Sequence, residues 1–173
     1  MIGMQRTTFS DQHCSVARTL DIIGEWWTLL ILRDLFYGVR RFEALHEQLG
    51  ISRKVLTSRL QRLTEEDILR KVPYQQAPLR YEYRLTAKGL DLMPVLLAMM
   101  RWGDRWLVEK DEIPVEFIHA DCGQVTVPKV ICSHCGGDLS ARNLRPRPGP
   151  GAVKEEIESM RAASVNTKLF SEE

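Results

Sequence analysis

Hydrophobic residues recur at helical spacing in the first part of the chain. In CSVARTLDII, residues 14–23, apolar residues lie three or four positions apart, which predicts a helix. Gly24 interrupts this pattern. The strongly apolar segment EWWTLLILRDLF follows and predicts a second helix that ends near Gly38. This second helix is expected to lie in the core.

Two further helical segments are separated by only a few residues. RFEALHEQL has apolar residues at helical spacing and predicts a short third helix that stops at Gly50. Ser52 is a favourable N-cap for a fourth helix, which covers about residues 52–66. Two helices joined by such a short turn are typical of a helix-turn-helix motif.

After Asp67 the pattern changes from helical to alternating. ILRKVPY and YEYRL alternate apolar and polar residues, and QQAPLR between them has the composition of a turn. Together they predict a hairpin with its tip near residues 75–78. Thr86 can cap a fifth, long helix that continues to about Lys110. Pro94 lies inside that helix and should kink it or mark a local break.

The order helix, helix, helix-turn-helix, hairpin and long helix predicts a winged helix-turn-helix fold. We expect a mainly α domain with a small β hairpin over residues 1–110. Residues 111–145 contain short β-like runs broken by glycine and proline, which predicts a small β-rich appendage. Residues 146–173 comprise a Pro/Gly linker and a C-terminal tail, in which AVKEEIESMRAAS predicts a short helix. No internal repeat is visible in the sequence.

The overall composition excludes several classes of protein. Of 173 residues, 44% are hydrophobic, which is enough for a packed core. There is no run of about 18 uncharged apolar residues, and the N-terminus has no apolar segment. We therefore expect a cytoplasmic protein with neither a secretory signal nor a membrane partner.

Charge is unevenly distributed along the chain, although the formal net charge is only +1. Residues 40–88 contain eleven lysines and arginines against six acids, and the fourth helix lies within this basic segment. Both a solvated charged surface and a nucleic-acid-binding surface fit this imbalance.

The fourth helix has one apolar stripe and an opposite face of cations, hydroxyls and an amide. On a helical wheel Leu56, Leu60 and Leu63 form a narrow arc that must face the core. A helix with such an outer face fits the DNA major groove, where Arg and Lys contact guanine and Gln contacts adenine. In helix-turn-helix proteins the start of the second helix makes most of these contacts. The predicted DNA-binding residues on this helix are Ser52, Arg53, Lys54, Thr57, Ser58, Gln61 and Arg62.

An ordinary amphipathic helix is the alternative interpretation of this segment. The turn before it and the hairpin after it favour DNA binding instead. Arg59 lies nearer the edge of the core and could either bind a phosphate or pair with an acid of the protein.

The hairpin, about residues 70–84, carries the cations that a DNA-binding wing needs. Arg80 follows its tip, where it could reach a phosphate or the minor groove. Arg40 and Arg41 open the third helix, where backbone amides and cations together favour a phosphate. For each of these residues a solvent-exposed charge without a ligand is the alternative.

Residues 14 to about 106 resemble the HxlR-type family of bacterial transcription regulators, relatives of the MarR winged-helix group. The resemblance rests on a cysteine-x-valine near the start, on GEWWTLLILRDL, on RRFEAL, on GISRKVLTSRL and on PLRYEYRLTAKG. It implies a homodimer that binds a pseudo-palindromic operator in double-stranded DNA through two symmetric winged helices. It also implies dimer contacts through the N-terminal and the long C-terminal helices. One departure is Glu25, where a cation is common in the family, and this removes one phosphate contact.

The fifth helix supports a dimer independently of the resemblance. Its apolar residues cover more of its circumference than one small domain can bury. A partner chain would cover the excess, or residues 111–140 would cover it instead. We also consider a small-molecule effector, whose pocket would lie between the long helices and the DNA-binding core and be lined by tryptophans.

Three of the four cysteines cluster near two histidines in the appendage. The spacing H-x-x-C and C-x-x-C predicts a Cys₃His zinc site that holds a zinc-ribbon-like appendage together. Its ligands would be His119, Cys122, Cys132 and Cys135. His134 could replace His119. An oxidant-sensing Cys132–Cys135 thiol pair and a degenerate ribbon without metal are the competing interpretations.

Cys14 stands apart from this cluster. In some members of the resembling family a cysteine at this position is thought to sense electrophiles or oxidants, which implies a thiol-based redox regulator as the alternative function. A small buried residue at a dimer interface is the plainer interpretation.

The sequence has no Gly-rich phosphate loop, no G-x-S-x-G and no H-E-x-x-H, so we do not expect an enzyme. The alternative enzyme would be a thiol oxidoreductase whose catalysis comes from the cysteine cluster. A winged helix that binds a protein instead of DNA is the third class of function.

Overall fold

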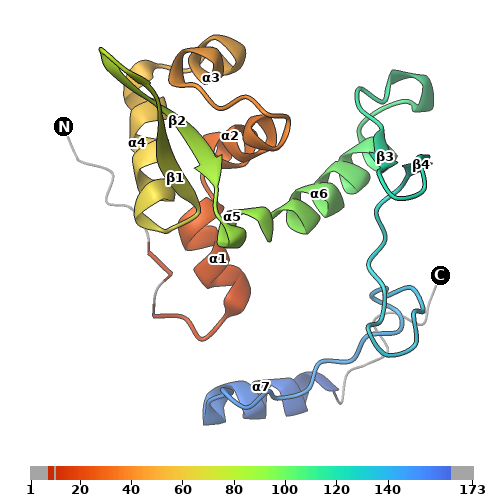
Figure 1. Cartoon of the computed structure of the whole chain (residues 1–173). Helices are drawn as coiled ribbons and strands as arrows, with labels where there is room; N and C mark the ends of the chain where they lie inside the picture. Colours follow the sequence, from red (N-terminus) through yellow and green to blue (C-terminus); the bar gives the residue numbers. More distant parts are fainter. Residues whose placement is uncertain (1–7, 10, 165–173) are drawn as a thin grey trace.

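The computed structural model describes residues 8–9 and 11–164. Helices dominate the first two thirds of the chain, and a single antiparallel hairpin forms the wing (Figure 1). The elements are α1 (Ser15–Ile23), α2 (Trp26–Phe36), α3 (Phe42–Leu49), α4 (Arg53–Glu65), β1 (Leu69–Gln76), β2 (Leu79–Leu85), α5 (Ala87–Leu90), α6 (Met93–Trp106), a 3₁₀ turn (Lys110–Glu112), β3 (Phe117–His119), β4 (Gln124–Thr126) and α7 (Lys154–Ser164). The predicted mainly α winged helix-turn-helix is confirmed, and so is the small β-rich region after it.

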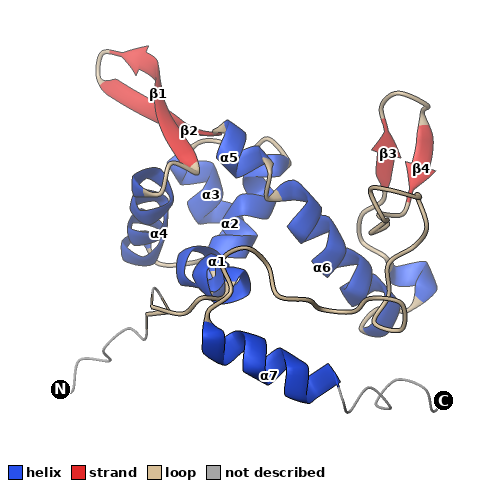
Figure 2. Cartoon of the chain, turned by 90° about the horizontal axis from the view of Figure 1, so that it is seen from below, coloured by secondary structure: helices blue, strands red, loops and turns tan. Residues whose placement is uncertain are grey.

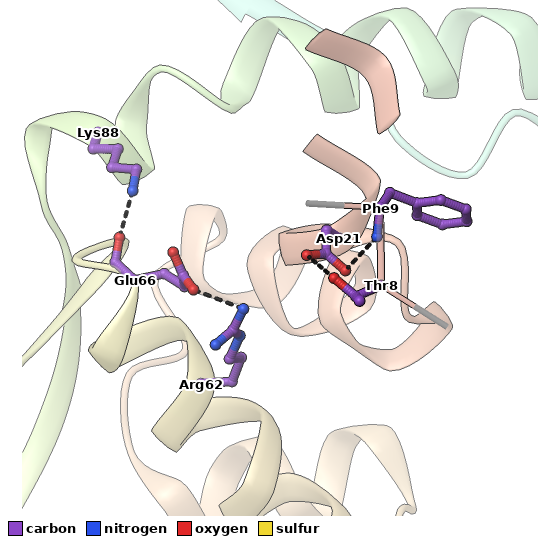
Figure 3. Close-up of polar contacts among 6 residues, drawn as sticks. All are labelled: Thr8, Phe9, Asp21, Arg62, Glu66 and Lys88. Carbon is purple, nitrogen blue, oxygen red and sulfur yellow. Dashed lines mark hydrogen bonds and ion pairs between the residues drawn. The ribbon is translucent and has the colours of Figure 1, made fainter. Parts of the chain in front are cut away.

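One hydrophobic core holds α1 to α4 and the base of the wing together. Its members are apolar side chains spaced three or four residues apart on each helix, so each helix turns one stripe inward. They are Ile23, Ile31, Leu32, Leu35, Leu45, Ile51, Leu56, Leu60, Leu63, Ile68, Leu69 and Leu96. The N-terminal segment is fixed to α1 because Thr8 and the Phe9 amide both donate to the Asp21 carboxylate (Figure 3).

The turn of the helix-turn-helix is short because Gly50 ends α3 in the left-handed conformation, with φ of 63°. Glycine, which has no Cβ, adopts that conformation more readily than other residues. The Ser52 hydroxyl then accepts from the Val55 amide at 3.3 Å and caps α4. The predicted positions of both residues are confirmed.

The wing is tied to the start of α3. Strands β1 and β2 pair with Leu69 opposite Leu85, and Arg41 forms an isolated antiparallel bridge to Glu82. The Tyr83 amide donates to the Arg40 carbonyl at 2.8 Å. This contact fixes the wing relative to the helix-turn-helix.

The long helix predicted after Thr86 is broken in two. Thr86 caps the short α5 by accepting from the Gly89 amide, and the chain turns at residues 91–92 before α6 begins. Pro94 lies in the first turn of α6, where a missing amide is harmless. The predicted break at this proline is confirmed, but α6 ends at Trp106, earlier than expected.

Helix α6 leads away from the core, and the β3–β4 hairpin lies at its far end (Figures 1 and 2). Only Leu96 on this helix is fully enclosed by the single chain. Among the described residues, no helix combines the length and the apolar character needed to cross a bilayer.

The appendage contains two small hairpins of the same construction. The first is β3–β4, with Ile118 opposite Val125. The second places Ile131 opposite Asp138. Every position of the second follows its counterpart by 13 residues, so the expectation that the chain has no internal repeat was wrong. The expected helix near the C-terminus is confirmed as α7.

Candidate DNA-binding surface and cysteine hairpins

The outer face of α4 begins with three exposed side chains that can donate hydrogen bonds. They are Lys54, Thr57 and Ser58. The opposite arc of Leu56, Leu60 and Leu63 is fully buried, as the helical wheel predicted. Ser52 is exposed too, but its hydroxyl is engaged as the N-cap. The first two turns of α4 therefore offer a polar surface of the size that enters a major groove.

Arg53 is held by an acid of the neighbouring helix. Its guanidinium binds the Glu43 carboxylate through two hydrogen bonds of 2.5 and 2.7 Å and lies over the Phe42 ring at 5.0 Å. The hydrogen bond from Arg53 holds the pKa of Glu43 below its usual value, and the same bond raises the pKa of Arg53. To contact a base, this arginine must first leave Glu43.

The last turns of α4 are paired with acids as well. The Gln61 amide donates to the Glu65 carboxylate at 2.9 Å. Arg62 is half-buried and forms an ion pair of 2.7 Å with Glu66, whose carbonyl accepts from Lys88 (Figure 3). On α4 the structure therefore leaves Lys54, Thr57 and Ser58 exposed without an acidic partner among the described residues, whereas Arg53, Gln61 and Arg62 are each paired with a glutamate.

Arg59 forms an internal ion pair, one of the two alternatives that its position left open. It lies 3.1 Å from the carboxylate of Glu25, the N-cap residue of α2. Glu25, which departs from the pattern of the resembling family, therefore has a partner on α4. The sequence alone could not reveal this contact because the two residues lie 34 positions apart along the chain.

Two arginines, Arg80 on the wing and Arg41 at the start of α3, carry positive charge at or beside the wing. Arg80 is exposed near the tip, opposite Gln75, and its charge is close enough to contribute to the low pKa of Glu43. Arg41 lies over the Tyr74 ring at 4.3 Å, which joins the start of α3 to β1.

The base of the wing carries a basic cavity. The sequence did not predict that its arginines line one cavity. The cavity has a volume of about 290 Å³, and three arginines line it beside Tyr83. They are Arg40, Arg70 and Arg84. Arg70 and Arg84 lie directly opposite each other on the two strands, and Arg84 is paired with Glu82. Burial raises the pKa of the Tyr83 hydroxyl.

The four predicted metal ligands are brought together as two pairs. Cys122 Sγ lies 3.4 Å from His119 Nδ1. In the other pair, the backbone amides of Cys135 and His134 donate to the Cys132 sulfur and lower the pKa of that thiol, and the Cys135 side chain adds to this effect. Within the described part of the chain no three such side chains form one group. The four-ligand zinc site stays a prediction.

Cys14 occupies the N-cap position of α1 and is exposed on the single chain. It makes no side-chain cap hydrogen bond there. All four cysteines are free thiols.

Two cavities, of about 790 and 640 Å³, lie between α6 and the β3–β4 hairpin. Trp102 and Trp106 line the first, and Arg101 donates to the Pro128 carbonyl at 2.9 Å between the two elements. The tryptophans therefore line a cavity on the appendage side of α6, whereas the effector pocket was expected on its core side.

Comparison with known proteins agrees with this geometry. Residues 22–111 match the family described as HxlR-like helix-turn-helix. An uncharacterised HTH-type transcriptional regulator of Mycobacterium tuberculosis is 48% identical over 137 residues, which cover 79% of this chain and 87% of the relative.

Two solved structures resemble the fold. PA1607, described as a candidate transcription factor, has a TM-score of 0.73 and 35% identity, and the match covers 83% of this chain and 100% of that one. The oxidised form of the redox regulator HypR has a TM-score of 0.50 and 33% identity, over 53% of this chain and 96% of that one. With its winged helix, its exposed α4 and these relatives, the chain belongs to the HxlR-like helix-turn-helix family of transcriptional regulators.

Proposed function

We propose that this protein is a homodimeric transcription regulator that binds a pseudo-palindromic operator in the bacterial cytoplasm. The observation that carries the proposal is the exposed polar face in the first two turns of α4, where Lys54, Thr57 and Ser58 project from a helix whose opposite face is buried in the core. In the bound state this turn enters the major groove, and Arg80 at the wing tip reaches the backbone or the minor groove.

Exposed apolar side chains support the dimer. On α6, Val95, Met99, Trp102 and Trp106 are between 42% and 62% exposed in the single chain. On α1, Val16 and Leu20 are also largely exposed. A second copy covers both helices and places the two recognition helices about 34 Å apart, one turn of B-DNA.

The test is a selection of binding sequences from a random pool of double-stranded DNA, followed by anisotropy titrations with the enriched duplex. Lys54→Ala should weaken binding by about tenfold because one groove contact is lost. Lys110→Ala removes a lysine from the 3₁₀ turn beyond α6 and should leave affinity unchanged. A pool without an enriched motif, or equal losses in both variants, would count against operator binding.

A second candidate function is a redox-controlled regulator. Its support is the exposed Cys14 thiol at the start of α1, together with the likeness to HypR, which is named a redox regulator. Treatment with a mild thiol oxidant should release the wild-type protein from its selected duplex and leave Cys14→Ser bound. Release of both proteins to the same extent would exclude Cys14 as the sensor.

A further inference from the structure

The two hairpins of the appendage repeat one another in sequence and in backbone geometry. FIHADCGQVT, residues 117–126, aligns with VICSHCGGDL, residues 130–139. At the shared offset of 13 residues an isoleucine, a cysteine and a glycine recur, and His119 corresponds to Cys132. The two hairpins therefore place a metal-binding side chain at both equivalent positions.

The turn at the tip is the same in both hairpins. The Gly123 amide donates to the His119 carbonyl at 2.8 Å, and the Gly136 amide donates to the Cys132 carbonyl at 2.8 Å. Both glycines adopt the left-handed conformation, with φ of 68° and 73°. This turn brings the side chain before it and the cysteine within it onto one side of each hairpin, as a pair of donors.

The spacing of the first pair suits a tetrahedral metal. Ligands at the usual zinc distances of about 2.3 Å for sulfur and 2.0 Å for nitrogen lie about 3.5 Å apart. The observed separation of Cys122 Sγ and His119 Nδ1 is 3.4 Å. The other ring nitrogen of His119 lies 3.6 Å from the Asp121 carboxylate, the kind of outer partner that orients a metal-bound imidazole.

The second pair of donors lies within one tight turn. The Cys132 amide donates to the Gly137 carbonyl and the Gly136 amide donates to the Cys132 carbonyl, each at 2.8 Å. Cys132 and Cys135 both lie in this turn, so the second hairpin supplies two sulfurs. Three thiols and one imidazole form a donor set that favours zinc over harder cations.

Both hairpins are rooted at one cavity. His119 of the first hairpin and Ile131, next to Cys132, line the cavity of about 790 Å³ beside α6. The linker between the hairpins is anchored through Pro128 to Arg101. His119 and the residue next to Cys132 therefore line the same cavity, and a short segment joins the two hairpins.

The appendage lacks an apolar core of its own. Five of its isoleucines and valines are more than half exposed, namely Ile118, Val125, Val127, Val130 and Ile131. A segment that cannot bury its apolar residues needs another source of stability, and a structural metal supplies it in small β ribbons.

We propose that the two hairpins are the halves of one tetrahedral zinc site formed by His119, Cys122, Cys132 and Cys135. Binding converts three thiols to thiolates and releases three protons, and the metal holds the hairpins against each other. The site is structural because all four positions are filled by protein.

The experiment uses the full-length protein, reduced and freed of metal. Titration with Co²⁺ should give the absorption bands of a tetrahedral thiolate site and saturate at one ion per chain, and Zn²⁺ should displace the cobalt. Native mass spectrometry should then find one zinc per chain. Cys122→Ser and Cys132→Ser, one from each hairpin, should each weaken metal binding by at least about a hundredfold.

Two matched variants serve as controls. Cys14→Ser removes a thiol outside the hairpins, and His134→Ala removes the imidazole that lies between the ligands of the second turn; both should bind metal as the wild type does. Three outcomes would overturn the proposal. They are no saturation at one ion, a loss in Cys132→Ser without any loss in Cys122→Ser, and a Cys132–Cys135 disulfide whose reduction restores no metal binding. None of these outcomes depends on DNA binding.

Discussion

At the scale of single residues, acidic neighbours decide which side chains of the recognition helix are available. Lys54 projects from α4 into solvent, whereas Arg53 is bound to Glu43 and Arg62 to Glu66. Either arginine must break its ion pair with glutamate before it can contact DNA. The availability of a cation on this surface therefore depends on residues of α3 and of the turn after α4.

Replacing Glu43 should release Arg53. In Glu43→Gln one acid near the DNA is removed and the guanidinium loses its charged partner, so affinity for the selected duplex should rise by about threefold to tenfold. Anisotropy titrations with the selected and a scrambled duplex measure this change.

Glu47→Gln is the control for this substitution, since it removes an exposed acid from the same helix. If both variants gain the same affinity, the effect comes from net charge and not from the release of Arg53.

The buried residues of α4 could be predicted from the sequence, but its ion pairs could not. Leu56, Leu60 and Leu63 follow from helical spacing alone. A helical wheel considers one helix at a time, whereas Glu43 and Glu25 reach α4 from other helices. Their contacts depend on tertiary packing, which local pattern does not encode.

At the scale of elements, the turn between α3 and α4 sets the geometry of the motif. Gly50 has a positive φ, and among the described residues, its two chain neighbours aside, no atom comes within 4 Å of where its Cβ would stand. The cost of a side chain there is therefore a backbone cost and not a clash.

Gly50→Ala should lower the free energy of unfolding by about 1 kcal/mol because alanine tolerates the left-handed region poorly. Gly50→Asn should cost less, since asparagine adopts this conformation more readily. Urea denaturation of the two variants and the wild type measures the difference. Equal stability of alanine and asparagine variants would show that φ at this turn is not what requires glycine.

The elements differ in how well the sequence predicted them. The helix-turn-helix and the wing were predicted because capping residues and alternation mark their ends. The repeated hairpins were not recognised as a repeat, because only three of ten aligned residues are identical. Their likeness lies in glycine conformation and hydrogen bonding, which a pattern of apolar residues does not record.

At the scale of the whole molecule, α6 extends from the core with little of its surface covered by its own chain (Figure 2). Trp102 is 59% exposed, and it also lines the cavity beside the β3–β4 hairpin. The apolar surface of this helix is the basis of the proposed dimer.

Trp102→Lys should shift the protein to a monomer, because a charge placed in an apolar interface loses its hydration. Light scattering after size-exclusion chromatography gives the mass directly. Leu144→Lys, in the exposed segment after the second hairpin, should leave the mass unchanged. A Trp102→Lys protein that stays dimeric would place the interface elsewhere.

The pairing of Arg53 with Glu43 has a consequence for how the protein responds to ionic strength. When Arg53 moves from its carboxylate to a base edge, the net charge of the interface does not change, and no phosphate is neutralised in the exchange. Counterion release should therefore come from Arg80 and similar cations that contact phosphates, whereas Arg53 contributes sequence discrimination. Arg53→Gln should flatten the preference between duplexes and leave the slope of log affinity against log salt concentration unchanged, while Arg80→Gln should reduce that slope by about 1.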